Sequence, residues 1–113
     1  MDDCIFCKIA SGAIPAKIAF EDDLVVAFHD IQPAAPTHIL LIPREHIPSA
    51  AQLGDGHAVL LGRIFAVAAR LASELGAQGG FRVVTNSGEM AGQSVAHLHF
   101  HLLAGRPMSW PPG

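Results

Sequence analysis

Three histidines alternate with apolar residues near the end of the chain, at His97, His99 and His101. If this segment is a β-strand, side chains two residues apart point to the same face, about 6.6 to 6.8 Å from one another. Neighbouring imidazoles at that spacing can both hydrogen-bond to a phosphate that lies across them, while the apolar residues between them point into the core. The pattern therefore predicts a site for phosphate chemistry on one face of a strand.

Two other interpretations of the three histidines stay open. The segment could be a solvent-facing strand without a function, although histidine is an uncommon residue and recurs here on an otherwise apolar strand. Alternatively, the histidines could hold a catalytic zinc ion, because a His-x-His pair on a strand can bind zinc and a third histidine would complete the set.

The residues just before the histidines could complete a phosphate site. Gly88, Gly92, Gln93 and Ser94 form a loop whose backbone N–H groups, together with the Ser94 hydroxyl, can point at an anion. Glycine and serine are also ordinary turn residues, so the loop alone is weak support. Its position directly before the three histidines favours a phosphate cradle.

Cys4 and Cys7 are the only cysteines in the chain, and two residues separate them. A pair so close in sequence cannot join distant segments as a disulfide framework does. The spacing instead indicates half of a metal site or a redox-active pair.

The elements that would position these residues follow from the hydrophobic pattern. Five segments have the composition of strands: 17–21, 24–28, 38–42, 81–85 and 95–103. The first two flank an Asp-Asp turn and predict a hairpin. From about Gly54 to Leu75 apolar residues recur at helical spacing, and Gly76 is placed to end the helix. The pattern predicts an α+β fold, an antiparallel sheet with one main helix across it.

The bulk composition limits the fold and the class of partner. With 113 residues, 50% of them hydrophobic, the chain has the size of one folded domain, predicted over residues 1–113. A net charge of only −3 argues against a disordered or nucleic-acid-binding chain, so a nucleotide partner would be small. The chain opens on no secretory signal pattern, and no apolar run reaches the roughly 20 residues of a membrane span. We therefore expect a cytoplasmic protein with no membrane partner.

The proline-rich residues 110–113 cannot continue a helix or a strand. They predict a C-terminal tail that packs against another surface.

The histidine pattern, the loop before it and the tail resemble the histidine-triad (HIT) family. The signature of that family is three histidines that alternate with apolar residues, and residues 97–103 match it at every position. Further segments resemble the Hint branch of the family: 28–31, 35–38, 42–46, 92–94 and 110–113. His101 argues against the transferase branch, which carries glutamine there. The resemblance implies the HIT-like fold, a five-stranded antiparallel sheet with one long helix and a short N-terminal helix.

By this resemblance the protein is a purine nucleoside phosphoramidate hydrolase without a catalytic cofactor. His99 would attack the α-phosphorus and form a covalent nucleotidyl-histidine, which water then hydrolyses to release AMP or GMP. An imidazole with an ordinary pKa of about 6.5 is largely neutral and nucleophilic at pH 7, which suits this role. His101 would hold phosphate oxygens and, with Ser94, assist the leaving group. His38 would keep the three histidines in their hydrogen-bonded arrangement.

The resemblance also implies a purine nucleotide pocket. Asp30 would accept hydrogen bonds from both ribose hydroxyls, as a carboxylate can, although the same residue could be a simple turn or cap residue. Five apolar residues would surround the base, although each of them, taken alone, is more typical of ordinary core: Phe6, Ile9, Ile14, Phe28 and Ile31. The remaining predicted nucleotide-binding residues are His29, Asn86 and Gln93, together with Ser94, His99 and His101.

Many bacterial relatives carry the cysteine pair together with histidines that match His46 and His97. The resemblance therefore implies a structural zinc site of two cysteines and two histidines, made of Cys4, Cys7, His46 and His97. As a zinc ligand, His97 could not also be a free acid or base, but its metal bond would fix the strand that presents His99. A redox pair or two unused thiols remain the alternatives.

Family members form homodimers through the long helix and the strand near Phe81, and the exposed edge of such a strand is a physical reason to pair. Trp110 and the residues after it would then reach the active site of the partner subunit and shape the leaving-group preference. A function of a different class remains open, a nucleotide-binding regulatory module with vestigial hydrolysis. The combination of His99, Ser94 and His101 favours the enzyme, since a binding module has no need of a nucleophile.

Overall fold

The computed structural model describes residues 3–113, so Met1 and Asp2 of the predicted domain lie outside the described residues. In chain order the elements are α1 (Ile5–Ser11), β1 (Ile18–Glu21), β2 (Val25–His29), β3 (Thr37–Pro43), α2 (Ala58–Glu74), β4 (Phe81–Val84) and β5 (Phe100–Ala104). Short 3-10 turns are η1 (Ala50–Gln52), η2 (Asp55–His57) and η3 (Glu89–Ala91). The strands form one antiparallel sheet in the order β1-β2-β3-β5-β4. The predicted α+β fold, with five strands, one long helix and a short N-terminal helix, is confirmed.

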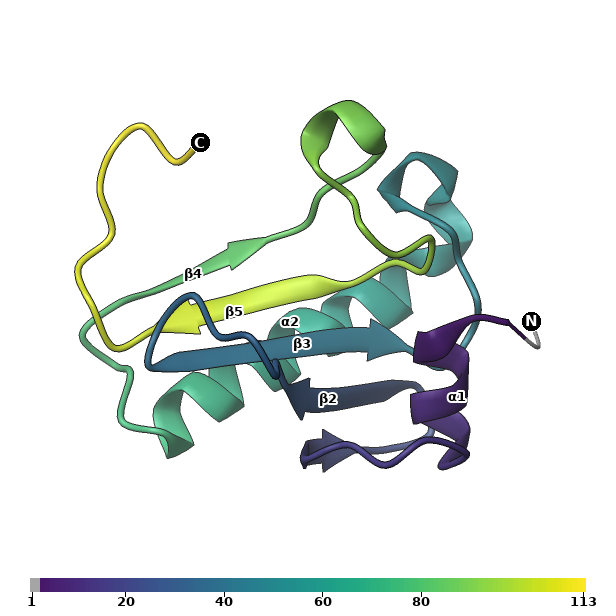
Figure 1. Cartoon of the computed structure of the whole chain (residues 1–113), viewed down its shortest axis with the longest axis horizontal. Helices are drawn as coiled ribbons and strands as arrows, with labels where there is room; N and C mark the ends of the chain where they lie inside the picture. The colour runs from purple at the N-terminus through teal and green to yellow at the C-terminus, as the bar shows by residue number, and fades with distance from the viewer. Residues whose placement is uncertain (1–2) are drawn as a thin grey trace.

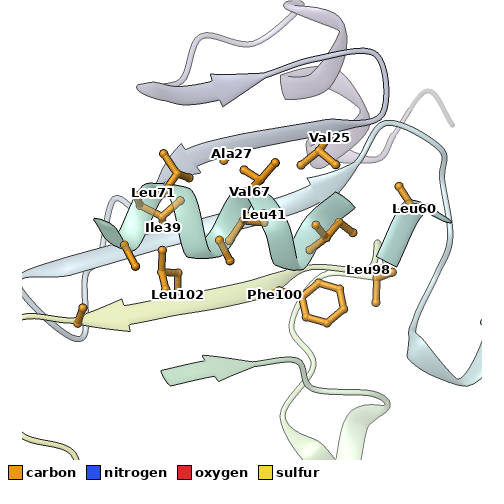
Figure 2. Close-up of a cluster of buried hydrophobic side chains, with 14 of the residues drawn as sticks. Val25, Ala27, Ile39, Leu41, Leu60, Val67, Leu71, Leu98, Phe100 and Leu102 are labelled. Carbon is orange, nitrogen blue, oxygen red and sulfur yellow. The ribbon is translucent and has the colours of Figure 1, made fainter. Parts of the chain in front are cut away.

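The long helix α2 packs on one face of the sheet (Figure 1). It buries a stripe of apolar side chains there: Leu60, Ile64, Val67 and Leu71. Alternate strand residues meet this stripe and complete the main core, among them Val25, Ala27, Ile39, Leu41, Phe100 and Leu102 (Figure 2). Gly76 ends the helix as predicted, with a φ of 78° and its N–H on the carbonyl of Ser73. By length and hydropathy alone the segment Asp55–Glu74 would also suit a membrane span, but here its apolar stripe belongs to the core.

The strand residues between those of the main core face the other side of the sheet. They form a second cluster with one residue of α1: Phe6, Val26, Phe28, Leu40 and Ile42. Figure 1 shows α1 beside the ends of β2 and β3. Cys4 is the N-cap of helix α1, and its sulfur accepts the N–H of Cys7 at 3.3 Å; Gly12 is the C-cap, with a φ of 84°. This second face of the sheet holds the candidate site.

The turn between β1 and β2 is built around Asp22. Its Oδ1 accepts the N–H groups of Leu24 and Val25, both at 2.8 Å, and its Oδ2 accepts the Nε–H of Arg63 at 2.7 Å. Burial raises the pKa of Asp22, but these hydrogen bonds outweigh burial and hold the pKa below its usual value. Because Arg63 belongs to α2, the same carboxylate ties the hairpin to the long helix.

Strand β5 is shorter than predicted, because it begins at Phe100 and not at Val95. In the register with β3, the partner of Leu98 would be Pro43, whose nitrogen has no hydrogen to donate. The N–H of Leu98 bonds instead to the carbonyl of Ile47 at 2.6 Å. The predicted start of this strand is therefore wrong, and the first two histidines of the pattern lie in the segment that leads into β5. The alternation of core and site side chains nevertheless holds through that segment.

The other predicted boundaries differ from the observed ones by one residue at strand ends. The predicted helix start near Gly54 corresponds to the 3-10 turn η2, which leads directly into α2.

The C-terminal residues do not pack on the rest of the same chain. Figure 1 shows the segment after β5 extending away from the sheet, and the side chain of Trp110 is 85% exposed. Two arginines attach the segment: Arg82 on β4 donates to the carbonyl of Ser109 at 2.8 Å, and Arg106 donates to the carbonyl of Ala34 at 3.1 Å. These polar contacts hold the backbone and leave the indole of Trp110 in solvent, so packing of the tail stays a prediction about a second subunit.

Candidate active site and metal cluster

A cavity of about 710 Å³ opens on the sheet face opposite α2, within the range of roughly 300 to 1,000 Å³ that is usual for small-molecule sites. The structure brings most of the predicted site residues together in its wall: Phe6, Ile9, Ile14, Phe28, His29, Asp30, Ile31, His38, Ser94, His99 and His101. Sequence reasoning did not assign the remaining lining residues to the site: Ile5, Pro15, Ala16, Lys17, Gln32, Pro33, Pro36, Leu40 and Val95.

The wall combines an apolar part with a polar part. Side chains of α1 and β2, such as Phe6 and Phe28, supply apolar surface, whereas Asp30, His101 and Ser94 supply hydrogen-bonding groups. The cavity therefore suits a ligand with one apolar portion and one portion rich in oxygen.

Asn86 and Gln93 do not line the cavity, although both were predicted to contact the nucleotide. The amide of Gln93 instead braces its own loop, since it accepts the N–H of Gly88 at 2.8 Å and donates to the carbonyls of Pro48 and Val95 at 2.7 and 2.9 Å. Gln93 thus fixes the backbone next to Ser94. The sequence contained no signal that separates a bracing glutamine from a ligand-binding one, because both lie in the same loop.

His99 has one ring nitrogen fixed by the backbone. Its Nδ1 lies 2.7 Å from the carbonyl oxygen of His97, and because a carbonyl only accepts, Nδ1 carries the hydrogen. The neutral ring then has its lone pair on Nε2. The side chain is 3% exposed and lines the cavity, so a nucleophilic nitrogen is the polar atom that His99 has left for a ligand.

His38 and His101 share a hydrogen bond whose direction is also set by the backbone. The N–H of Ala34 donates to Nδ1 of His38 at 2.9 Å, so the hydrogen of neutral His38 is on Nε2. That Nε2 lies 2.9 Å from Nδ1 of His101 and donates to it. The hydrogen of neutral His101 is therefore on its own Nε2, where it can be donated to a ligand in the cavity.

Burial keeps these two histidines neutral. Desolvation lowers the pKa of His38, although the nearby Asp30 carboxylate opposes the effect. Desolvation also lowers the pKa of His101, with further lowering by His99 and His38. At neutral pH the pair is uncharged, which agrees with the hydrogen positions deduced from the geometry.

Asp30 keeps acceptor capacity for a ligand. Its Oδ1 accepts the N–H of Gln32 at 2.8 Å, and its Oδ2 lies 3.4 Å from Nε2 of His38. A carboxylate has about four lone-pair sites, so these two contacts leave room for a pair of hydroxyl donors.

A metal ion could in principle be held by Asp30, His38 and His101, but the hydrogen bonds of His38 are incompatible with one. Their ligand atoms lie within 4.8 Å of one another, as a metal site would require. A metal would need the lone pair of Nε2 of His38, but the N–H of Ala34 already occupies Nδ1 and leaves the hydrogen on Nε2. The cluster therefore fits a hydrogen-bond relay and not a catalytic zinc site.

A second cluster does have metal-ligating geometry: Cys4, Cys7, His46 and His97, whose ligand atoms all lie within 4.8 Å of one another. Nδ1 of His97 lies 3.4 Å from Sγ of Cys4 and 3.5 Å from Sγ of Cys7, and Nδ1 of His46 lies 3.3 Å from Sγ of Cys7. Around a tetrahedral zinc ion with bonds of about 2.0 to 2.3 Å, ligand atoms lie roughly 3.3 to 3.8 Å apart. The donor set and its spacing fit zinc.

The protonation of His97 also fits a metal ligand. Its Nε2 donates to the carbonyl of Pro43 at 2.9 Å, which leaves the lone pair on Nδ1, the atom that faces the two sulfurs. Complete burial of the ring lowers the pKa of His97. The pKa of the Cys7 thiol is raised by burial and by its contact with Cys4, so a cation would relieve an unfavourable pair of thiolates.

A model of the HIT domain matches residues 11–108. An uncharacterized HIT-like protein from Synechocystis is 50% identical over 113 residues, which cover 99% of this chain and 98% of the relative. A 14 kDa zinc-binding protein from Brassica juncea is 46% identical over 113 residues, covering 98% of this chain and 100% of the relative. Among solved structures, a HIT family hydrolase from Legionella pneumophila matches with a TM-score of 0.96 and 48% identity, over 98% of this chain and 100% of that one.

Proposed function

The chain belongs to the HIT family, and on that premise we propose that it is a Hint-type hydrolase, which cleaves the P–N bond of purine nucleoside 5′-phosphoramidates and releases AMP or GMP. The observation that carries the proposal is the hydrogen bond from Nδ1 of His99 to the carbonyl of His97, which leaves the lone pair of the neutral ring on Nε2, in a cavity that also has His101 and Ser94 in its wall.

In the proposed first step, the lone pair on Nε2 of His99 attacks the α-phosphorus. The Nε2–P bond forms, the P–N bond breaks, and the nitrogen leaves as an amine after taking up a proton from solvent that the Ser94 hydroxyl relays. The Nε2–H of His101 and the hydroxyl of Ser94 can donate hydrogen bonds to the phosphate oxygens and to the leaving group. In the second step water attacks the phosphorus and forms the new P–O bond, the proton that water loses returns to solvent, and His99 departs with the electron pair of the Nε2–P bond.

The nucleoside would occupy the rest of the cavity. The ribose hydroxyls would donate to Asp30, which lies in the same wall as the reactive histidines. The purine would lie against the apolar side chains of α1 and β2, including Phe6 and Phe28, whose own ring centroids are 5.5 Å apart. This arrangement gives each part of a nucleoside monophosphate a chemically matched surface.

We propose that the cluster of Cys4, Cys7, His46 and His97 holds a structural zinc ion. When bound there, zinc supplies a tetrahedral cross-link between the N-terminal helix and the segments around His46 and His97. The name of the Brassica relative supports zinc binding in this family, and the ligand spacing in this chain supports it independently.

We also propose that the protein is a homodimer. Strand β4 is an edge of the sheet, and apolar side chains on and near it are exposed: Phe65 by 51% and Phe81 by 43%. An edge with such residues is a surface on which a second sheet can pair. In that dimer the exposed C-terminal tail of one subunit would reach the cavity of the other.

The test is to incubate the protein with adenosine 5′-phosphoramidate and follow the release of AMP, with and without a chelator and beside His99→Ala. We expect wild type to turn over, the chelator to have little immediate effect, and His99→Ala to be inactive.

Two outcomes contradict the proposal in different ways. If wild type binds AMP but releases none from the phosphoramidate, the regulatory-module hypothesis replaces the enzyme. If the chelator stops the reaction at once in a protein that is still folded, the covalent-histidine mechanism is wrong and catalysis depends on the metal.

A further inference from the structure

Phe6 lies between the cysteine cluster and the nucleotide cavity. It is flanked by Cys4 and Cys7 in sequence, so the turn of α1 that carries both sulfurs also carries the ring. The side chain is 7% exposed and lines the cavity. No feature of the sequence gave Phe6 a role beyond that of an apolar pocket residue.

The ring of Phe6 contacts both sites. Its centroid lies 5.9 Å from that of His97, a member of the metal cluster, with an interplanar angle of 76°. It lies 5.1 Å from that of His99, the proposed nucleophile, at 83°. Both contacts are edge-to-face, a geometry that aromatic rings prefer and that fixes their relative orientation. One side chain therefore joins a metal ligand to the reactive imidazole.

A second contact links the same two histidines. The carbonyl of His97 accepts the Nδ1–H of His99 at 2.7 Å, so the orientation of the reactive ring depends on where the backbone of His97 lies. The metal ligand and the nucleophile are thus held together through the backbone and through Phe6.

The position of α1 depends on its attachments. The helix has seven residues, which is well below the roughly 12 to 15 at which an isolated helix becomes even marginally stable. At its C-terminal end, Arg44 donates to the carbonyl of Ala10 at 2.6 Å. At its N-terminal end the attachment is the cysteine cluster, with Cys4 against His97 and Cys7 against His46. Metal binding would therefore fix the end of α1 that bears Phe6.

We propose that Phe6 couples the metal site to the nucleotide site, so that a metal ion held by the cysteine cluster and a purine nucleotide in the cavity each strengthen the binding of the other. Phe6 acts as a positioning residue: the metal fixes its turn, and its ring in turn fixes the apolar wall and the His99 imidazole. The inference rests on the proposed function, because it requires a nucleotide in the cavity and a metal in the cluster.

Coupling between two binding sites is reciprocal, so it can be measured in the metal-loaded protein without any catalytic turnover. If the metal raises the affinity for AMP by some factor, AMP must raise the affinity for the metal by the same factor. The experiment is to titrate zinc-loaded protein with a chelating dye to equilibrium and to determine the dissociation constant for zinc, with and without saturating AMP. We expect AMP to lower that dissociation constant at least about fivefold, the lower end of the range for coupled sites.

Two variants separate coupling from simple loss of binding. In Phe6→Ala we expect AMP, at a concentration that saturates that variant, to lower the dissociation constant for zinc by much less than in wild type, because only the backbone contact between His97 and His99 still joins the two sites. Ile9→Ala is the matched control, because Ile9 lies on the same helix and lines the same cavity but is not flanked by the cysteines. It should weaken AMP binding and still show the full drop in the dissociation constant for zinc once AMP saturates the site. If Phe6→Ala loses its near-ultraviolet circular dichroism, Phe6→Leu takes its place, since leucine keeps most of the buried volume but has no ring edge.

The outcomes distinguish this inference from the proposed function. If calorimetry shows that AMP binds zinc-loaded wild type while the dissociation constant for zinc stays unchanged, the coupling is wrong and the proposed function stands. If Phe6→Ala or Phe6→Leu keeps the full effect of AMP, Phe6 is not the link. If AMP does not bind zinc-loaded wild type at all, the proposed function itself fails.

Discussion

At the scale of single residues, the chemistry of this site depends on which nitrogen of each imidazole carries the hydrogen. In His38, His97 and His99 a backbone group decides: an amide N–H occupies one nitrogen of His38, and carbonyls accept the hydrogens of His97 and His99. His101 takes its tautomer from His38. As a result, the lone pair of His97 is directed to the metal cluster and that of His99 is available as a nucleophile. The Nε2–H of His101 is available as a hydrogen-bond donor. Each role is fixed before any ligand binds.

Replacement of His38 tests this relay, because its two nitrogens have separate partners. In His38→Asn the amide oxygen can still accept the N–H of Ala34, but no donor reaches His101. In His38→Gln the longer side chain places an amide donor near the position of Nε2. We expect His38→Asn to lower kcat for adenosine 5′-phosphoramidate about 10- to 100-fold, as loss of an orienting partner typically does, with little change in KM.

His38→Gln should recover part of the lost kcat. Steady-state rates of AMP release measure both variants. Equal kcat values in the two would mean that His101 does not depend on a donor at residue 38.

At the scale of elements, the point where β3 and β5 stop pairing determines how two histidines of the site are oriented. Pro43 has no N–H, so pairing between β3 and β5 stops before it would reach Leu98. Beyond that point the carbonyls of Pro43 and His97 no longer belong to the β3–β5 ladder, and they accept the ring hydrogens of His97 and His99. A shorter β5 is therefore part of how the two histidines are oriented.

The β1–β2 turn gives a prediction about stability at this scale. In Asp22→Ala three hydrogen bonds are lost, two to backbone N–H groups and one to Arg63 on α2. We expect the free energy of unfolding to fall by about 1 to 3 kcal/mol, as measured by urea denaturation at neutral pH. Asp23→Ala is the matched control, since Asp23 is an exposed carboxylate in the same turn, and it should change the stability by less than about 0.5 kcal/mol.

The cost of Asp22→Ala should also depend on pH. The pKa of Asp22 is lowered in the native state, so its contribution is present above the unfolded pKa of about 3.9 and is lost as the pH falls through the lower native value. The difference between wild type and Asp22→Ala should therefore shrink in strong acid. A difference that stays constant down to that range would mean that the ionised carboxylate is not what holds the turn.

At the scale of the whole molecule, the sheet separates stability from chemistry. The face against α2 is a closed apolar core, whereas the other face carries the cavity and the metal cluster. The two edges of the sheet also differ, because Phe65 on α2 packs edge-to-face on Phe100 of β5 at 5.6 Å and extends the apolar surface beside β4. A partner subunit would cover that edge.

The proposed homodimer can be tested with two matched substitutions. Phe81 on β4 and Ile18 on β1 lie on opposite edge strands and are similarly exposed, by 43% and 40%. We expect Phe81→Arg to shift the protein from dimer to monomer in sedimentation velocity, because it places a charge in the apolar interface, and Ile18→Arg to leave the dimer intact. A wild type that sediments as a monomer, or a dimer lost only in Ile18→Arg, would contradict pairing through β4.

The sequence by itself determined the elements and the identity of the reactive residues. Helical and strand periodicities are local properties, so they predicted α2, the strands to within a residue at most ends, and the α+β class. The alternation of His97, His99 and His101 and the spacing of Cys4 and Cys7 are equally local, and the family resemblance added the histidines that complete each cluster. These patterns depend only on whether each segment is a helix or a strand and not on how the segments pack together.

Only the tertiary structure decided how those residues are protonated and what they contact. The partner atoms are backbone groups of residues far along the chain or outside any motif, such as the N–H of Ala34 and the carbonyl of Pro43, and residue type does not encode a free backbone group. The same holds for Gln93, which braces a loop, and for Phe6, which joins two sites. Hydrogen bonds and ring contacts depend on the relative placement of backbones that periodicity leaves open, and that placement is settled only when the sheet, α1 and the loops pack together.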